Sequence, residues 1–252
     1  MSTRRRIGST TGRGGPHTAG MALTPSADSF AALARSSPWR WSTLRFTVRW
    51  TGPHPPSRGP VRAWLRRPDV LRVESAEGGL LQVVRERGAV WPRPRPRLRP
   101  DGLVEDRRES WDHSLDDPMF QNYHWVAMLD PAELADGRDQ DTGALVPALD
   151  VDDVGEVGHG GRPAWEAVVR ARPGYEPRCG CCSLLRTPEV DAAESLPQGL
   201  LDAYPEAYRV RLDRQTGVCV LLEAIGAPVP VAGHDLRIEA VDEPMPDELF
   251  TG

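Results

Sequence analysis

The cysteines are the residues of this chain whose spacing suggests the most distinctive chemistry. Three of the four cysteines, Cys179, Cys181 and Cys182, crowd into one predicted turn, and the fourth, Cys219, follows on a predicted strand. Four thiolates can hold a tetrahedral Zn²⁺ ion, although the familiar arrangement uses two separated Cys-x-x-Cys pairs. Three interpretations therefore stay open: a structural zinc site or disulfide, ordinary small buried thiols, and a redox or catalytic thiol.

The zinc and disulfide interpretations require Cys219 to lie beside the 179–182 turn. A disulfide needs Cα atoms within about 7 Å of each other, and zinc needs sulfurs about 2.3 Å from the metal. Strand 163–172 leads to Cys179, and strand 218–223 carries Cys219 in the same part of the predicted sheet. We therefore expect Cys219 to join the other three cysteines, and we expect no other cofactor.

The remaining motifs give no positive case for an enzyme. The sequence contains no Ser-centred nucleophile elbow, P-loop or dinucleotide fingerprint. His124, in Asn-Tyr-His-Trp, is interpreted as a packed imidazole rather than a base. Segment 150–155 resembles a calcium loop, but Val154 stands where an oxygen ligand is needed and Gly161 where the closing glutamate should be. We expect a protein without catalytic residues.

Strict alternation over residues 43–51 gives the clearest structural signal. Every even position is apolar and every odd position is polar, as in an antiparallel strand with one face against a core. A slip of one residue would invert every side chain, so the pattern fixes which face is buried. We expect Leu44, Phe46, Val48 and Trp50 to be less exposed than Arg45, Thr47 and Arg49.

Other segments complete a sheet of antiparallel strands. Apolar runs bounded by turn residues predict strands at 61–67, 70–75, 80–87, 163–172, 207–213, 218–223 and 236–241. A short helix is expected over 26–34 with Ser26 as its N-cap, and a second from Asp130, its N-cap, to Gly137. The acidic stretch 138–160 predicts a loop with one weak strand, and the alternating Pro and Arg residues of 92–100 predict an extended connector.

Composition favours one β-rich domain behind a disordered N-terminal segment. Residues 1–25 are polar, Gly-rich and free of aromatic side chains, which predicts disorder. Residues 26–250 fit a single domain, because the chain's 24 glycines and 25 prolines suit many short strands joined by turns. No stretch reaches the roughly 18 apolar residues of a membrane span, so no transmembrane segment is expected.

Charge and the N-terminal sequence bear on partners and location. Residues 1–100 carry 19 arginines against five acidic residues, a bias found on some nucleic-acid surfaces. We favour the interpretation that the acidic residues of 101–252 neutralise this basic half within one fold. We expect no nucleic-acid partner, because the sequence contains no known nucleic-acid-binding motif. The basic start at 4–6 is not followed by an apolar core, so no secretory signal is predicted. We expect a cytoplasmic protein with reduced cysteines, or an extracytoplasmic one if the true start lies elsewhere.

The alternating strand also offers a candidate ligand-binding face. Seven of the eight tryptophans fall between residues 39 and 125. They either pack the core and sheet faces, which we favour, or line a ligand site. A curved sheet with an apolar concave face could hold an apolar small molecule or a lipid, unless helices plug it. The candidate residues are Leu44, Phe46, Val48 and Trp50, with Val61, Ala63 and Leu65 on the next strand.

Several turn motifs carry a resemblance to a known family. They are Gly59-x-Val61-x-x-Trp64-x-x-x-Pro68-x-x-x-Arg72, Gly88-x-x-Trp91, and the segments 161–165 and 208–217. In these the chain resembles the lipoprotein-carrier (LolA-like) half-barrel, of the type also found in sigma-factor regulators. Segments 178–182, 213–220 and 243–250 are similar to uncharacterised proteins of high-GC bacteria, a likeness that implies no activity. The half-barrel resemblance implies a strongly curved antiparallel sheet with a few short covering helices, a cavity for acyl chains and no catalytic residues, although such proteins work outside the cytoplasm.

Two hypotheses follow for a fold of the α+β, β-rich class. The first is a non-enzymatic ligand-binding or interaction domain that holds an apolar or acyl ligand in the concave sheet. The alternative is a cytosolic metal- or redox-responsive protein whose output depends on Cys179, Cys181, Cys182 and Cys219. Neither hypothesis identifies a protein partner.

Overall fold

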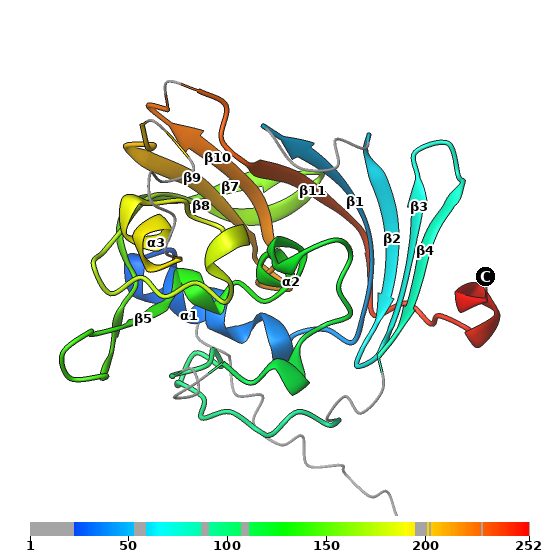
Figure 1. Ribbon diagram of the computed structural model, residues 1–252. Coiled ribbons are helices and arrows are strands. Elements are labelled where there is room, and N and C mark those ends of the chain that lie inside the picture. The colour runs from blue at the N-terminus through cyan, green and yellow to red at the C-terminus, as the bar shows by residue number, and fades with distance from the viewer. Residues whose placement is uncertain are drawn as a thin grey trace, which may run out of the picture.

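One antiparallel sheet dominates the molecule (Figure 1). The computed structural model describes residues 23–52, 59–86, 91–106, 111–194, 201, 203–227 and 229–251. Within these residues the sheet has nine strands in the order β4-β3-β2-β1-β11-β10-β9-β8-β7. Their bounds are β1 Thr43–Thr51, β2 Val61–Arg66, β3 Val70–Ser75, β4 Leu80–Arg85, β7 Leu149–His159, β8 Arg162–Ala171, β9 Ala207–Asp213, β10 Cys219–Ile225 and β11 Gly233–Val241. Two short strands, β5 Asp136–Arg138 and β6 Leu145–Pro147, pair separately.

Strand β1 joins the two halves of the sheet. It pairs with β2 on one side and with β11, from the far end of the sequence, on the other. The predicted alternation is confirmed for Leu44, Phe46 and Val48, which are at most 1% exposed, while Arg49 is exposed. Trp50, at the end of the run, is half-buried. The buried face of β1 therefore belongs to the core.

Strand β7 is the main difference from the predicted sheet. The acidic stretch 138–160 predicted a loop with one weak strand, yet β7 runs for 11 residues and pairs with β8. Its core-facing valines, Val151, Val154 and Val157, are spaced by three instead of two. The register shifts between Asp152 and Gly155, so a bulge disguises the period of two. Most other predicted strands agree with the structure to within a few residues.

Three α-helices lie in the described part of the chain: α1 Ala27–Ser36, α2 Tyr123–Leu129 and α3 Pro188–Ala193. The helix predicted after Ser26 is confirmed, and the Ser26 hydroxyl caps it by accepting from the Ser29 backbone N–H at 3.1 Å. The helix predicted to start at Asp130 is wrong. Asp130 is the C-cap of α2, only a 3₁₀ turn at Ala132–Leu134 follows, and Gly137 lies in β5.

Helices α1 and α2 pack against one face of the sheet (Figure 1). The Phe46 ring of β1 lies 5.3 Å from the indole of Trp125 in α2, measured between centroids. Phe30 of α1 and Trp165 of β8 are fully buried in the same core. The cysteine loop described below follows β8.

The architecture is β-rich α+β, as predicted. Strong curvature of the sheet stays a prediction, as does the division into a disordered segment and a single domain. Residues 1–22 lie outside the described residues, whereas Leu23 already packs against the core. In the part of the chain that the structure describes, no helix is long and apolar enough to cross a membrane.

Candidate metal centre

Three of the four cysteines meet on one loop between β8 and α3. Cys179 precedes the 3₁₀ turn Gly180–Cys182, which carries the other two. The Cys179 sulfur lies 3.1 Å from each of the other two sulfurs, and the sulfurs of Cys181 and Cys182 are 3.6 Å apart. All three thiols are free, and Cys181 is exposed to solvent. Converging sulfurs are the donor set that soft metal ions prefer.

A buried carboxylate holds both ends of this loop. Glu133 is 1% exposed and accepts hydrogen bonds from the backbone N–H groups of Arg178 at 3.0 Å and Leu184 at 2.9 Å. The Tyr175 hydroxyl donates to the same carboxylate at 2.6 Å. Burial raises the pKa of Glu133, and these hydrogen bonds oppose the rise. One side chain thus spans the base of the cysteine loop.

Two arginines tie the loop further. Arg186 donates to the carbonyl oxygens of Gly180 at 2.7 Å and Cys181 at 3.0 Å. Arg178 binds Asp116 and, at 2.6 Å, Asp130. The backbone on both sides of the sulfurs is therefore positioned by the protein itself, which lowers the ordering cost that a ligand would have to offset.

The pKa values of Cys181 and Cys182 are raised. Burial, followed by hydrogen bonds with Cys179, raises the pKa of Cys182. The pKa of Cys181 is raised by its hydrogen bond with Cys179, by burial and by the charges of Cys179 and Glu194. A metal ion must displace the thiol protons, because the thiolate is the ligand.

Cys219 does not join this group. It is fully buried on β10, and its thiol donates to the carbonyl oxygen of Leu221 at 3.5 Å. The sulfurs of Cys179, Cys181 and Cys182 all lie within 4.8 Å of one another, and the Cys219 sulfur is not part of this group. Burial and the charge of Glu133 raise the pKa of Cys219. This corrects the expectation that Cys219 joins the other three sulfurs in one group: β10 buries it in the core.

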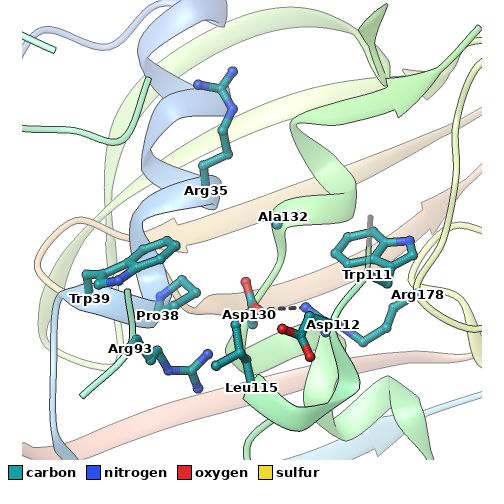
Figure 2. A pocket seen from close by; sticks show the side chains of 10 residues that line it. All are labelled: Arg35, Pro38, Trp39, Arg93, Trp111, Asp112, Leu115, Asp130, Ala132 and Arg178. Atoms are coloured by element: carbon teal, nitrogen blue, oxygen red, sulfur yellow. Dashed lines mark hydrogen bonds and ion pairs between the residues drawn. The ribbon is translucent and has the colours of Figure 1, made fainter. Parts of the chain in front are cut away.

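A small pocket shares Arg178 with the cysteine loop (Figure 2). Its volume is about 60 Å³, and Trp39, Trp111 and Leu115 contribute to its walls. Asp130 also lines it, with Oδ2 bound to Arg178 and Oδ1 buried without a hydrogen-bond partner. Arg178 lies over the Trp111 ring at 4.5 Å from its centroid. One side chain therefore connects the base of the cysteine loop with the wall of this pocket.

The apolar sheet face predicted to bind a ligand is covered by α2. The indole of Trp125 lies 5.3 Å from the Phe46 ring and 6.3 Å from the Trp50 ring. The other five candidates are at most 1% exposed: Leu44, Val48, Val61, Ala63 and Leu65. A ligand could reach this face only if the side chains packed on it moved, Trp125 of α2 among them. Binding of a lipid or another apolar molecule there stays a prediction.

His124 is a packed imidazole, as predicted. It is 1% exposed, and its Nε2 lies 2.9 Å from Nδ1 of His234, which is fully buried on β11. Nε2 of His234 lies 2.8 Å from the carbonyl oxygen of Cys219 and must donate, because a carbonyl only accepts. When His234 is neutral its Nδ1 accepts, so His124 donates through Nε2. The pair fastens α2 to β11 and β10.

Sequence reasoning found the sulfurs but missed the residues that position them. Glu133 falls in a segment whose sequence predicts a short helix, and nothing in its surroundings indicates that it is buried. Arg178 directly precedes Cys179 in the sequence, which is the one available signal. The contacts of Glu133 and Arg186 span the fold and follow from packing alone.

No family model and no curated protein matches the chain. Among solved structures it is similar to MucB in complex with MucA(peri), with 16% identity and a TM-score of 0.41 over 90% of this chain and 60% of that chain. It is also similar to MucB itself, with 17% identity and a TM-score of 0.40 over 88% and 60% of the two chains. The complex structure of Pseudomonas aeruginosa MucA/MucB matches with 17% identity and a TM-score of 0.40, over 90% of this chain and 61% of that chain. The chain thus spans about 60% of the length of the MucB chains that it matches.

Proposed function

We propose that this chain is a non-enzymatic binding domain that holds one thiophilic metal ion, of the Zn²⁺ and Cu⁺ class, through Cys179, Cys181 and Cys182. The observation that carries the proposal is the convergence of three free sulfurs, 3.1–3.6 Å apart. Thiolate sulfur favours these ions, whereas Mg²⁺ and Ca²⁺ favour oxygen.

The sulfur positions fit such an ion after a small adjustment. Two sulfurs on one tetrahedral zinc are about 3.8 Å apart, since each Zn–S bond is about 2.3 Å long. The sulfurs here are closer than that by less than ~1 Å. Rotation of the exposed Cys181 side chain widens the two separations that involve Cys181, and the Cys179 and Cys182 sulfurs must also move apart by a similar small amount. The Glu194 carboxylate borders the turn, since a Cβ on Gly180 would lie 2.1 Å from its Oε1, but it is not part of the group of three sulfurs and would have to move to become a fourth ligand.

The test is a competition titration of the reduced protein. Zn²⁺ or Cu⁺ is added in the presence of a chromophoric chelator, and the absorbance reports how much metal the protein removes. We expect one ion per chain. We expect Cys181→Ser to lower the affinity at least about tenfold, because it removes a direct ligand.

Cys219→Ala is the matched control, because Cys219 is buried outside the group of three sulfurs. It should keep the stoichiometry and affinity of the native chain. Lack of metal binding by the native protein would refute the proposal. So would a Cys181→Ser variant that binds as tightly as the native chain.

A further inference from the structure

Residues 243–251, here called the C-terminal segment, fold back onto the outer face of the sheet. In Figure 1 the segment, coloured red, lies beside β3 and β4, away from α1 and α2. Its side chains Met245 and Phe250 are 8% and 1% exposed. They pack in a small apolar group, here called the outer cluster, with Val70, Trp64, Val83 and Leu249. The side chains that β2, β3 and β4 contribute point away from the main core, as the alternation of a strand requires.

Arginines of three neighbouring strands bind the main chain of this segment. Four of its carbonyl oxygens accept guanidinium N–H groups at ordinary hydrogen-bond distances. The bonds are Arg66 to Met245 at 2.7 Å, Arg72 to Leu249 at 3.1 Å and to Thr251 at 3.0 Å, and Arg85 to Phe250 at 3.0 Å. The sheet thus holds the segment, in which Asp247–Phe250 form a 3₁₀ turn, mainly through its carbonyl oxygens.

The contacts make few demands on the sequence of the bound segment. The four carbonyl bonds are independent of side-chain identity. Arg66 adds an ion pair with Asp247 at 2.6 Å and lies 5.0 Å from the centre of the Phe250 ring. The surface therefore selects an acidic segment with two apolar anchors, in the places of Met245 and Phe250. A second chain with these features could use the same donors.

The outer cluster is separate from the main core. Val70, Met245 and Phe250 form a buried group of their own, while the main core lies on the other face of the sheet. Release of the C-terminal segment would expose Trp64, Val70 and Val83 without uncovering Phe46 or the rest of the core. The segment can therefore exchange with a competitor while the domain stays folded.

We propose that the outer face of β2, β3 and β4 is a protein-interaction surface. Its resident occupant is the C-terminal segment, and an acidic segment of a partner protein, with two apolar anchors, binds there by displacing it. Charge favours this class of partner, because Arg66, Arg72 and Arg85 line the surface while the resident segment itself is acidic. The proposal is independent of metal binding, which involves the loop between β8 and α3.

The experiment uses the full chain and a fluorescent synthetic peptide with the sequence of residues 242–251. Binding is followed by fluorescence anisotropy. A loosened variant carries Met245→Ala and Phe250→Ala, so that its own segment no longer competes. We expect this variant to bind the peptide at least tenfold tighter than the native chain, because a tethered competitor acts at a concentration on the order of millimolar. Adding Arg72→Gln to the loosened variant should weaken binding about tenfold or more, since it removes two carbonyl bonds.

Two controls test whether the peptide binds at this surface and through its anchors. A peptide with alanine at both anchors should not bind, and Cys181→Ser should bind the peptide as the native chain does. Equal affinity of the native and loosened chains for the peptide, or an Arg72→Gln change without effect, overturns the proposal. If the loosened variant does not fold, hydrogen exchange of the native chain decides. Faster exchange at the amides of residues 249–251 with excess peptide supports displacement, and unchanged exchange overturns it.

Discussion

Arg67 and Asp117 form a fully buried ion pair in which Nε and Nη2 each lie 2.7 Å from a separate carboxylate oxygen. Arg93 adds a third bond to Asp117 at 2.8 Å, and the Arg67 guanidinium lies 3.3 Å from the centre of the Trp41 ring. Burial alone would raise the pKa of Asp117, but the charges of the two arginines outweigh burial and lower it. The carboxylate therefore stays charged inside the protein.

Asp117→Asn should lower the free energy of unfolding by about 3–5 kcal/mol, because it leaves Arg67 as a buried charge without a compensating anion. Asp152→Asn is the control. Asp152 forms a 2.8 Å pair with Arg170 in which both side chains are more than half exposed, so its loss should cost less than about 1 kcal/mol. Urea unfolding measures both. Similar, small losses in the two variants would contradict the prediction.

Tyr208 predicts a dependence of stability on alkaline pH. Its hydroxyl donates to the Arg186 carbonyl and accepts from the Arg186 N–H, each at 2.9 Å, and burial raises its pKa to about 12. The unfolded value is about 10, so this contribution is fully present below about pH 10 and is lost as the pH rises toward 12. Tyr208→Phe should cost about 1–3 kcal/mol at neutral pH. The difference from the native chain should shrink above about pH 10, and a constant difference in denaturant titrations would contradict the assignment.

The four thiols should differ in reactivity. Cys181 is exposed, whereas Cys219 is fully buried and burial raises its pKa. We expect a thiol-alkylating reagent to modify Cys181 first and to leave Cys219 unmodified until the protein unfolds, as followed by peptide mass spectrometry. In denaturant all four should react. Modification of Cys219 in the native protein as fast as Cys181 would show that β10 does not bury it.

Removing a large side chain from the core under α2 should leave a cavity and strongly lower the free energy of unfolding. Phe46 is fully buried against Trp125, so Phe46→Ala should lower the free energy of unfolding by about 3–5 kcal/mol. Leu80 is 45% exposed on edge strand β4, and Leu80→Ala should change stability by less than about 1 kcal/mol. Urea unfolding compares the two variants. A mild effect at Phe46 would mean that α2 is easily displaced, which would favour an open ligand face.

Regular alternation explains which parts of the fold could be predicted. Strand β1 is nine residues of strict period two, and its bounds agree with the range that the sequence predicts. The full length of strand β7 was not predicted, because its bulge changes the spacing of its valines. Helix α2 was not predicted, because its seven residues are too few to show a helical period and six of them are buried. The sequence pattern of apolar residues predicts a strand or helix only where the structure keeps the regular strand or helix periodicity.

The candidate site was predictable only where its residues are neighbours in sequence. Cys179, Cys181 and Cys182 are close in space because one turn holds them. The place of Cys219 depends on how β10 pairs with β9 and on the bulge after Cys219, neither of which leaves a local signal. The contact between Glu133 and the loop backbone depends on the packing of two distant segments. Long-range geometry of this kind follows from the whole fold.

Glu133→Gln tests whether this carboxylate positions the cysteine loop. Oε1 of Glu133 accepts from the Leu184 N–H and the Tyr175 hydroxyl, while Oε2 accepts from the Arg178 N–H. The oxygen of a glutamine amide can keep the first two bonds, but its NH₂ group would then face the Arg178 N–H, and two donors cannot bond to each other. The buried Arg178 amide would lose its acceptor, and we expect the free energy of unfolding to fall by about 1–3 kcal/mol. We also expect faster alkylation of Cys179 and Cys182, because the loop end is released. Glu156→Gln, in an exposed pair with Arg214, is the control and should change neither quantity measurably. Loss of stability without a change in alkylation rates would assign Glu133 to the core alone, with no role in shaping the cysteine loop.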